Sequence, residues 1–201
     1  MQPVSLVVEG ACDEAVLRRL IEGHGLTTGP VYVTSGKARL DQRLAAYQNA
    51  GRHQPWIVLR DLDVDAECAP TLLERYRVEQ TSLFRLQLAV RAIEAWLLAD
   101  RQGFARFLSV PVNRVPLDPE SIKDPKQYVV QLARQSRSRA IVGGLVPDPG
   151  TSASVGRSYA TRLIEFSTCD WDPSSAAIRS PSLSSLIRHL TRLALESRSR
   201  E

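Results

Sequence analysis

Carboxylates gather in one short stretch, "IVLRDLDVDAEC", where Asp61, Asp63 and Asp65 alternate directly after an apolar run. Like charges so close together repel one another unless a cation lies among them. Oxygen ligands with no histidine or cysteine among them favour a hard divalent cation, so these residue types predict a Mg²⁺ or Mn²⁺ site. If the backbone stays extended, the three side chains point to the same side and two of them can share one ion.

Two glutamates elsewhere in the chain could join these aspartates. Glu9 directly follows the apolar run Val4–Val8, at the point where a buried strand would end. Glu94 is the one polar residue in "AIEAWLLA", so a helix there would bury its carboxyl group. A buried carboxylate is costly, and we expect it to be protonated, paired with an arginine such as Arg91, or aimed at a metal ion.

Basic residues near the aspartates could hold phosphate groups. Lys37 follows Gly36 where a helix should begin, a setting suited to an anion, although the full phosphate-loop pattern is absent. Arg60 directly precedes Asp61 and could neutralise part of its charge. A purely structural alternative stays open, in which the aspartates cap the next helix or hydrogen-bond to their own backbone.

The elements that would position these residues alternate between strand and helix. Short β-branched runs at 4–8, 30–36 and 56–63 predict strands, and helical spacing at 12–25 and 37–51 predicts the helices between them. A fourth strand is expected at 82–90. This order predicts an α/β fold, with a mainly parallel, Rossmann-like sheet flanked by helices.

The second half of the sequence predicts a helical C-terminal extension. Helices are expected near 71–77, 91–108, 126–135, 158–167 and 180–197, the last capped by Ser180 with Pro181 in its first turn. Residues 110–124 and 141–156 are rich in Pro, Gly and polar residues and are expected to be loops. We therefore divide the chain into an α/β core, 1–109, and an extension, 110–201, packed on it as one structural unit.

Composition limits the class of protein. The chain has 201 residues, 43% hydrophobic and 24% charged, which is typical of a soluble globular domain. No apolar run approaches the roughly 20 residues of a membrane helix, and no signal peptide is evident, so we expect a cytoplasmic protein without a membrane partner. Three widely spaced cysteines, Cys12, Cys68 and Cys169, are expected to be reduced thiols. The net charge of +4, with its excess mostly arginine, is compatible with a polyanionic partner, but solvated arginines on helix faces are the favoured explanation.

Several segments resemble a known family. "VVEGACDE" with Glu9, followed by "VLRDLDVD", resembles the Toprim domain of primases, topoisomerases and OLD-family nucleases. "TSGKARL", "RLQLAVRAIEAWLLAD", "DPKQYV", "VGRSYATRLIEF" and "SPSLSSLIRHL" resemble an uncharacterised bacterial Toprim-like family, domain of unknown function 4276 or RloG-like. The resemblance implies a Toprim-like fold, Glu9 as general acid or base, and Asp61 and Asp63 as ligands of Mg²⁺. The overlapping pair Asp63 and Asp65 is an alternative frame. The resemblance also implies an ATPase partner and a place in a defence or mobile-element system.

We therefore expect a metal-dependent nuclease that cleaves phosphodiester bonds in nucleic acid. Asp61 and Asp63, or Asp63 and Asp65, would hold Mg²⁺ or Mn²⁺, with Glu94 completing the metal shell. Glu9 would transfer a proton, and Lys37 and Arg60 would hold flanking phosphates. Two alternatives remain: a non-catalytic binding or sensor subunit of a partner ATPase, and a DNA-binding domain that relies on its arginines alone.

Overall fold

A four-stranded parallel sheet forms one half of the molecule. In the computed structural model, which describes residues 3–199, the strands are β1 (Val4–Val8), β2 (Thr28–Val33), β3 (Trp56–Asp61) and β4 (Phe84–Ala89). Their order across the sheet is β2-β1-β3-β4, and every pair is parallel. The α/β prediction is therefore confirmed, with the arrangement of a Rossmann-like sheet flanked by helices.

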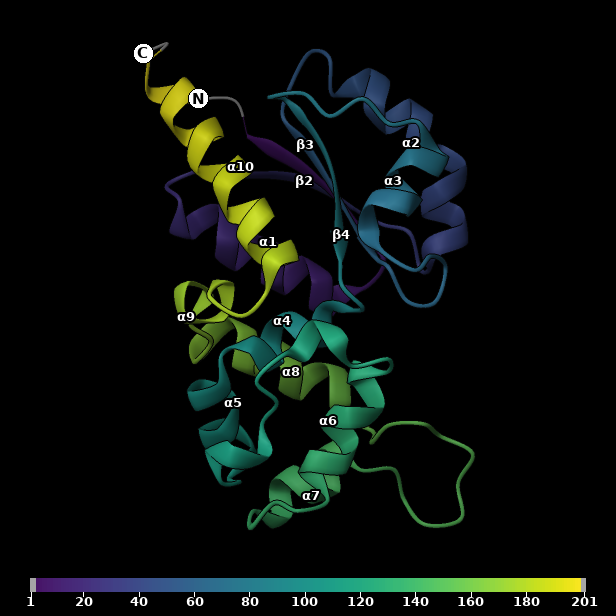
Figure 1. The fold of residues 1–201 in the computed structure, drawn as a ribbon, viewed down its shortest axis with the longest axis vertical. Helices are drawn as coiled ribbons and strands as arrows, with labels where there is room; N and C mark the ends of the chain where they lie inside the picture. The colour runs from purple at the N-terminus through teal and green to yellow at the C-terminus, as the bar shows by residue number, and fades with distance from the viewer. Residues whose placement is uncertain (1–2, 200–201) are drawn as a thin grey trace.

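Helices make up most of the remaining structure (Figure 1). Those that follow the first three strands are α1 (Ala11–Gly23), α2 (Lys37–Ala50) and α3 (Ala69–Tyr76). Those that follow β4 are α4 (Ile93–Ala99), α5 (Arg101–Leu108), α6 (Pro125–Ala133), α7 (Arg139–Leu145), α8 (Tyr159–Cys169), α9 (Pro173–Ala177) and α10 (Pro181–Arg198). Short 3₁₀ turns at Val112–Arg114 and Pro119–Ser121 interrupt the expected loop.

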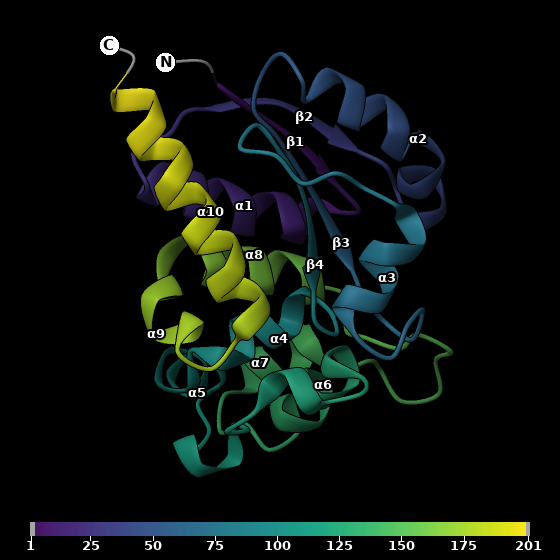
Figure 2. The ribbon, with the colours of Figure 1, turned by 45° about the horizontal axis from the view of Figure 1, so that its top comes forward.

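Both faces of the sheet are covered, which explains why the strands are nearly continuous apolar runs. Successive side chains alternate between the faces, so Leu6 and Val8 join one hydrophobic cluster and Val7 joins the other. Helices α2 and α3 cover the second face, and α1 and α10 cover the first (Figure 2). The β2 edge of the sheet pairs with β1 alone.

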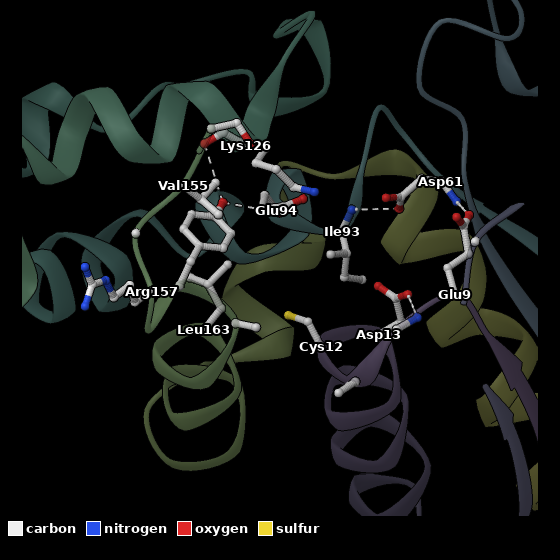
Figure 3. A pocket seen from close by; sticks show the side chains of 17 residues that line it. Glu9, Cys12, Asp13, Asp61, Ile93, Glu94, Lys126, Val155, Arg157 and Leu163 are labelled. Atoms are coloured by element: carbon white, nitrogen blue, oxygen red, sulfur yellow. Dashed lines mark hydrogen bonds between the residues drawn. The ribbon is translucent and has the colours of Figure 1, made fainter. Parts of the chain in front are cut away.

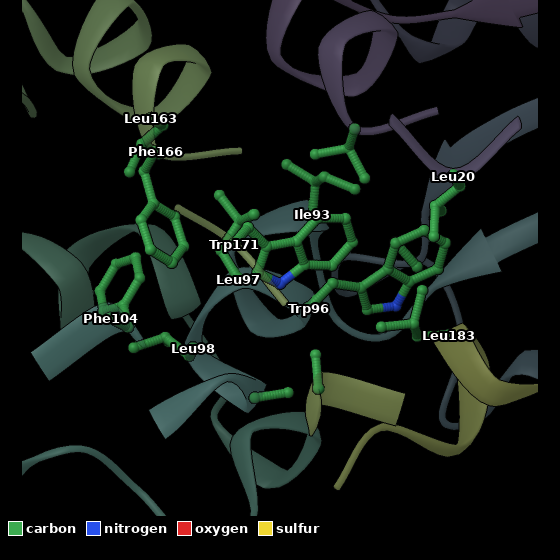
Figure 4. Packing of buried hydrophobic residues seen from close by; sticks show 14 of the residues in the cluster. Leu20, Ile93, Trp96, Leu97, Leu98, Phe104, Leu163, Phe166, Trp171 and Leu183 are labelled. Carbon is green, nitrogen blue, oxygen red and sulfur yellow. The ribbon is translucent and has the colours of Figure 1, made fainter. Parts of the chain in front are cut away.

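The helices α4–α9 gather around the carboxyl ends of the strands (Figure 1). Their core continues the cluster on the first face of the sheet and contains Trp96, Phe104, Phe166 and Trp171, all fully buried (Figure 4). This helical part begins at α4, earlier than the boundary at 109, and α10 returns from it to pack on the sheet. Residues of the sheet and of the helical part thus share one hydrophobic cluster.

Two local expectations were wrong, one helix was not expected, and the expected cap at Ser180 is present. The helix expected over 91–108 is broken at Asp100 into α4 and α5. Helix α7, residues 139–145, overlaps the start of the loop expected over 141–156, and α9 was not expected. Ser180 does cap α10, accepting a hydrogen bond from the backbone of Leu183.

Two general expectations concern cysteine and membranes. Cys12, Cys68 and Cys169 are free thiols, as expected. None of the helices formed by residues 3–199 combines the length and apolar character needed to cross a bilayer.

Candidate functional site

The carboxyl ends of β1 and β3 open into a pocket of about 560 Å³ where the sheet meets the helical part (Figure 3). Such crevices are the usual position of active sites in parallel sheets. Distant segments meet there, because the pocket is lined by the residues after β1, the end of β3, the start of α4, the first turn of α6 and the loop into α8. The acidic residues that line it are Glu9, Asp13, Asp61 and Glu94.

Glu9 and Asp61 are adjacent because β1 and β3 are neighbours. The backbone N–H of Asp61 donates a hydrogen bond to Glu9 Oε1, 3.1 Å away. One oxygen of Asp61, Oδ1, accepts a hydrogen bond of 2.9 Å from the backbone N–H of Ile93. These bonds orient both carboxylates at the edge of the pocket.

Asp13 is an acidic residue of this site that the sequence analysis did not select. It lies in the first turn of α1, is buried, and accepts a hydrogen bond of 2.9 Å from the backbone N–H of Gly10 through Oδ2. Acidic residues in a first helical turn commonly have no function beyond interaction with the helix dipole, so its type and position gave no distinguishing signal.

Glu94 is buried as expected, with only 3% of the residue exposed. Its Oε1 accepts a hydrogen bond of 3.2 Å from the Tyr159 hydroxyl, whereas Oε2 has no hydrogen-bond partner within residues 3–199. Arg91 does not pair with it, because that guanidinium donates to the backbone carbonyls of Asp63, Ala66 and Glu67. A buried carboxyl group with an unpartnered oxygen therefore faces the pocket.

Burial raises the pKa of all four carboxyl groups, and repulsion among them adds to the rise at Asp13 and Asp61. Burial raises the pKa of Glu9 and of Glu94. Burial, with repulsion from Glu9 and Glu94, raises the pKa of Asp13 to about 7. Burial, with repulsion from Asp13, Glu94 and Glu9, holds the pKa of Asp61 well above its usual range. A cation among these groups would relieve both effects.

Asp63 and Asp65 lie outside the pocket lining and form a second polar cluster with Lys37 and Arg60. The Lys37 ammonium lies 2.9 Å from a carboxylate oxygen of each aspartate. The backbone does not stay extended after Asp61, because Asp63 has a positive φ of 49°. The condition under which three aspartates would point to the same side is therefore not met.

Arg60 is almost fully buried and holds several elements together. It bonds to Asp41 on α2 through Nε and Nη2, to Asp65 at 2.8 Å, and to the backbone carbonyl of Asp61. Burial alone would raise the pKa of Asp65, but hydrogen bonds from Lys37 and Arg60 outweigh that effect and lower it. Both basic residues proposed for phosphate binding are thus engaged by aspartates.

Other groups complete the lining of the acidic pocket. Lys126, in the first turn of α6, is exposed and forms no ion pair within 3–199, and its charge opposes the rise in the pKa of Glu94. Arg157 is paired with Asp148 on the surface. Tyr159 hydrogen-bonds to Glu94 and to the carbonyl of Lys126. Burial, with the nearby charges of Glu94 and Asp13, raises the pKa of the Cys12 thiol, which disfavours a thiolate.

The pocket's oxygen ligands are of the type that a hard cation prefers, but their side chains are not arranged as a complete metal site. Four carboxyl groups line the pocket, and carboxylate oxygens are the ligands that Mg²⁺ prefers. Among the described residues, the buried Glu94 Oε2 has no hydrogen-bond partner. Within the described part of the chain, however, no group of three or more His, Cys, Asp or Glu side chains has an arrangement that could hold a metal ion. Mg²⁺ commonly binds through one or two carboxylates together with water and substrate phosphates. Because Glu94 Oε2 has no partner and Asp61 Oδ2 accepts no hydrogen bond within residues 3–199, Asp61 and Glu94 each have an oxygen that could hold it.

No protein-family model matches the chain, and no curated protein or solved structure is significantly similar to it. The Toprim-like resemblance therefore stays a prediction, and the pocket is the feature from which a function can be inferred.

Proposed function

We propose that the protein catalyses Mg²⁺- or Mn²⁺-dependent cleavage of phosphodiester bonds in nucleic acid. One observation carries the proposal: Glu9, Asp61 and Glu94, from three distant segments, line one pocket together with the exposed ammonium group of Lys126. Acids can hold a cation and a lysine can bind the phosphate that the cation contacts. The resemblance of the segments around Glu9 and Asp61 to Toprim nucleases points to the same class.

Each side chain has a distinct role in this proposal. Asp61 and Glu94 would hold the cation, which when bound polarises a phosphoryl oxygen and stabilises developing negative charge. Glu9, positioned by the backbone of Asp61, transfers a proton to or from the reacting oxygens. Asp13, with a pKa of about 7, is a second group suited to proton transfer near neutral pH. Tyr159 positions Glu94, and Lys126 donates to a phosphate oxygen.

The second cluster would support the site without holding the cation. Asp63 and Asp65 neutralise Lys37 and Arg60, and Arg60 ties the end of β3 to α2. The metal frame in this proposal is thus Asp61 with Glu94, in place of two alternate aspartates.

A second function is favoured by one specific observation. Because no preassembled group of three metal-binding side chains exists within 3–199, the protein would equally suit a non-catalytic role. In that case it would be the binding or sensor subunit of a partner ATPase, as the family resemblance implies for a defence or mobile-element system.

A cleavage assay with matched variants tests the proposal. Single- and double-stranded DNA and RNA are incubated with the protein and Mg²⁺ or Mn²⁺. Asp61→Asn should reduce cleavage by at least about 100-fold, since it removes a ligand. Asp63→Asn, two residues away but outside the pocket, should change the rate less than about threefold.

The outcomes separate the two functions. Cleavage that is unchanged in Asp61→Asn would refute the proposed site. Wild-type protein that binds Mn²⁺ in calorimetry but cleaves none of the four substrates, alone or with any ATPase that co-purifies with it, would support the non-catalytic function.

A further inference from the structure

A second hollow, of about 510 Å³, lies at the β2 edge of the sheet, between β2 and α2. In Figure 2, α2 lies at the end of the sheet toward which the edge strand β2 runs. The residues that matter here are Tyr32, Thr34, Arg39, Arg43 and Tyr47. None of the described residues that line this hollow is acidic. We call it the Tyr32 hollow.

Tyr32 presents an aromatic ring to solvent although it belongs to the sheet. The residue is 45% exposed. One side of its ring stacks on Trp56, with ring centroids 5.3 Å apart and an angle of 17° between the planes. Tyr47 stacks on the same tryptophan at 5.8 Å. The ring is thus supported from beneath, and its exposed side can receive another flat aromatic group.

Two arginines stand beside this ring without acidic partners. Arg39 and Arg43 are exposed, one helical turn apart on α2. Within residues 3–199 neither side chain forms an ion pair, in contrast to Lys37 and Arg60, which are both held by aspartates. Like charges at this spacing repel one another, and a phosphate chain would relieve the repulsion.

The Tyr32 hollow and the acidic pocket are lined by neighbouring positions of the segment that follows β2. Thr34 lines the hollow and Gly36, two residues later, lines the pocket. The Thr34 side chain is fixed by hydrogen bonds to the carbonyls of Val8 and Gly36. A nucleic-acid strand bound at the acids that extends past Gly36 and Thr34 would therefore reach Tyr32.

We propose that the Tyr32 hollow binds an unpaired segment of nucleic acid, with one base stacked on Tyr32 and the adjacent phosphates bound by Arg39 and Arg43. The inference rests on the proposed function and deepens it by naming a single-stranded segment as the substrate class. A base within a duplex has no free face to stack on Tyr32, so duplex should bind more weakly.

Binding is measured in EDTA, so that no cleavage occurs. Fluorescence anisotropy with labelled single-stranded DNA, single-stranded RNA and the matching duplex reports affinity. Tyr32→Ala should weaken binding of single strands by about tenfold or more, because base stacking on the ring is lost. Tyr32→Phe, which keeps the ring, should bind as the wild type does. DNA and RNA probes show which sugar is preferred.

The arginines are tested by the salt dependence of the same binding. Replacing both in Arg39→Ala/Arg43→Ala should lower the slope of log affinity against log salt by about 1.4 for single strands. The control Arg106→Ala/Arg114→Ala removes the same charge from two exposed arginines of the helical part and should leave the slope unchanged. Tyr32→Ala removes a ring that packs on Trp56, whereas the arginine variants change only exposed side chains and should leave the fold intact.

The result separates this inference from the proposed function. Loss of single-strand affinity in the Tyr32 and arginine variants supports the hollow even if wild-type protein never cleaves. Unchanged affinity and salt slope in both variants, or tighter binding of duplex than of single strands, would overturn it, even if Asp61-dependent cleavage is observed.

Discussion

At the scale of a single residue, Glu94 is expected to lower the stability of the metal-free protein. Its carboxyl group is buried, Oε2 has no partner within residues 3–199, and burial raises its pKa. Glu94→Met, which keeps the length of the side chain without its charge, should raise the free energy of unfolding in metal-free buffer by about 1–3 kcal/mol. Urea denaturation measures this change. The same variant should lose most of the rise in melting temperature that Mn²⁺ produces in the wild type.

Glu120 is the matched control for this substitution. Its Oε1 accepts hydrogen bonds from the hydroxyls of Ser180 and Ser182 and from the backbone N–H of Ser182. Glu120→Met should therefore lower the free energy of unfolding by about 2–4 kcal/mol. If Glu94→Met destabilised the protein as much, Glu94 would be an ordinary structural acid and the metal-holding role would lose its support.

Single residues differed in how well the sequence identified them. Glu94 was identifiable because it is the one polar residue in an apolar helix, and Glu9 because it ends a buried strand. Asp13 was not, because acidic residues are common in a first helical turn, and Lys126 was not, because an exposed lysine is common on any protein surface. The separation of Asp61 from Asp63 depends on a backbone turn with positive φ that residue types do not reveal.

Asp100 shows at the scale of elements what ends one helix and begins the next. Its side chain is buried, Oδ1 accepts from the backbone N–H of Gly103 and Oδ2 from that of Asp172. One carboxylate thus caps α5 and ties it to the loop before α9. Asp100→Ala should lower the free energy of unfolding by about 2–4 kcal/mol, because two backbone donors lose their partner.

Asp124 offers a control of the same residue type. It caps α6 through the N–H of Gln127 but is exposed. Asp124→Ala should cost only about 1 kcal/mol in the same urea denaturation series. Equal losses for Asp100→Ala and Asp124→Ala would show that the link between α5 and the loop before α9 adds nothing beyond a cap.

Elements were predictable where a local pattern determines them. The four strands and the helices between them follow from apolar runs and helical spacing. The break at Asp100 was missed because helical composition continues through "EAWLLADRQGF" and the interruption depends on contacts with a residue far along the chain. Helix α7 was missed because Gly143 and Gly144 lower its intrinsic helix propensity, and its buried residues Ile141 and Leu145 stabilise it by packing.

Helix α10 joins the two halves of the molecule, because it follows the helical part and packs on β4 of the sheet. His189 lies on this helix and is buried. Only 8% of this residue is exposed, and its Nε2 has no hydrogen-bond partner among the described residues. Burial, with the positive charges of Arg85 on β4 and Arg192 on α10, lowers the pKa of His189 to about 4. The neutral ring is therefore the form that fits the folded protein.

The stability of the whole chain should depend on pH through this group. In the unfolded chain the pKa of histidine is about 6.5, so above that pH the ring is neutral in both states and contributes nothing. As pH falls below 6.5, the unfolded state gains a proton before the folded state does. Stability is then lost progressively down to about pH 4, by up to about 3 kcal/mol.

Comparison of the wild type with His189→Leu isolates this contribution. The difference in free energy of unfolding between the two proteins should shift in favour of the variant between pH 7 and pH 4, and other titrating groups cancel in the comparison. A difference that stays constant over this range would show that folding leaves the pKa of His189 unchanged.

The position of α10 also affects how the protein folds. Arg85 on β4 bonds to Ser185 on α10, 100 positions later, and Gln87 bonds to the carbonyl of Ser182. Contacts between such distant residues form slowly, because a long loop must close first. Until α4–α9 have collapsed and brought α10 into place, part of one sheet face stays open to water. At that stage of folding, aggregation through the exposed apolar surface would compete with the docking of α10, and a chaperone would help the chain most.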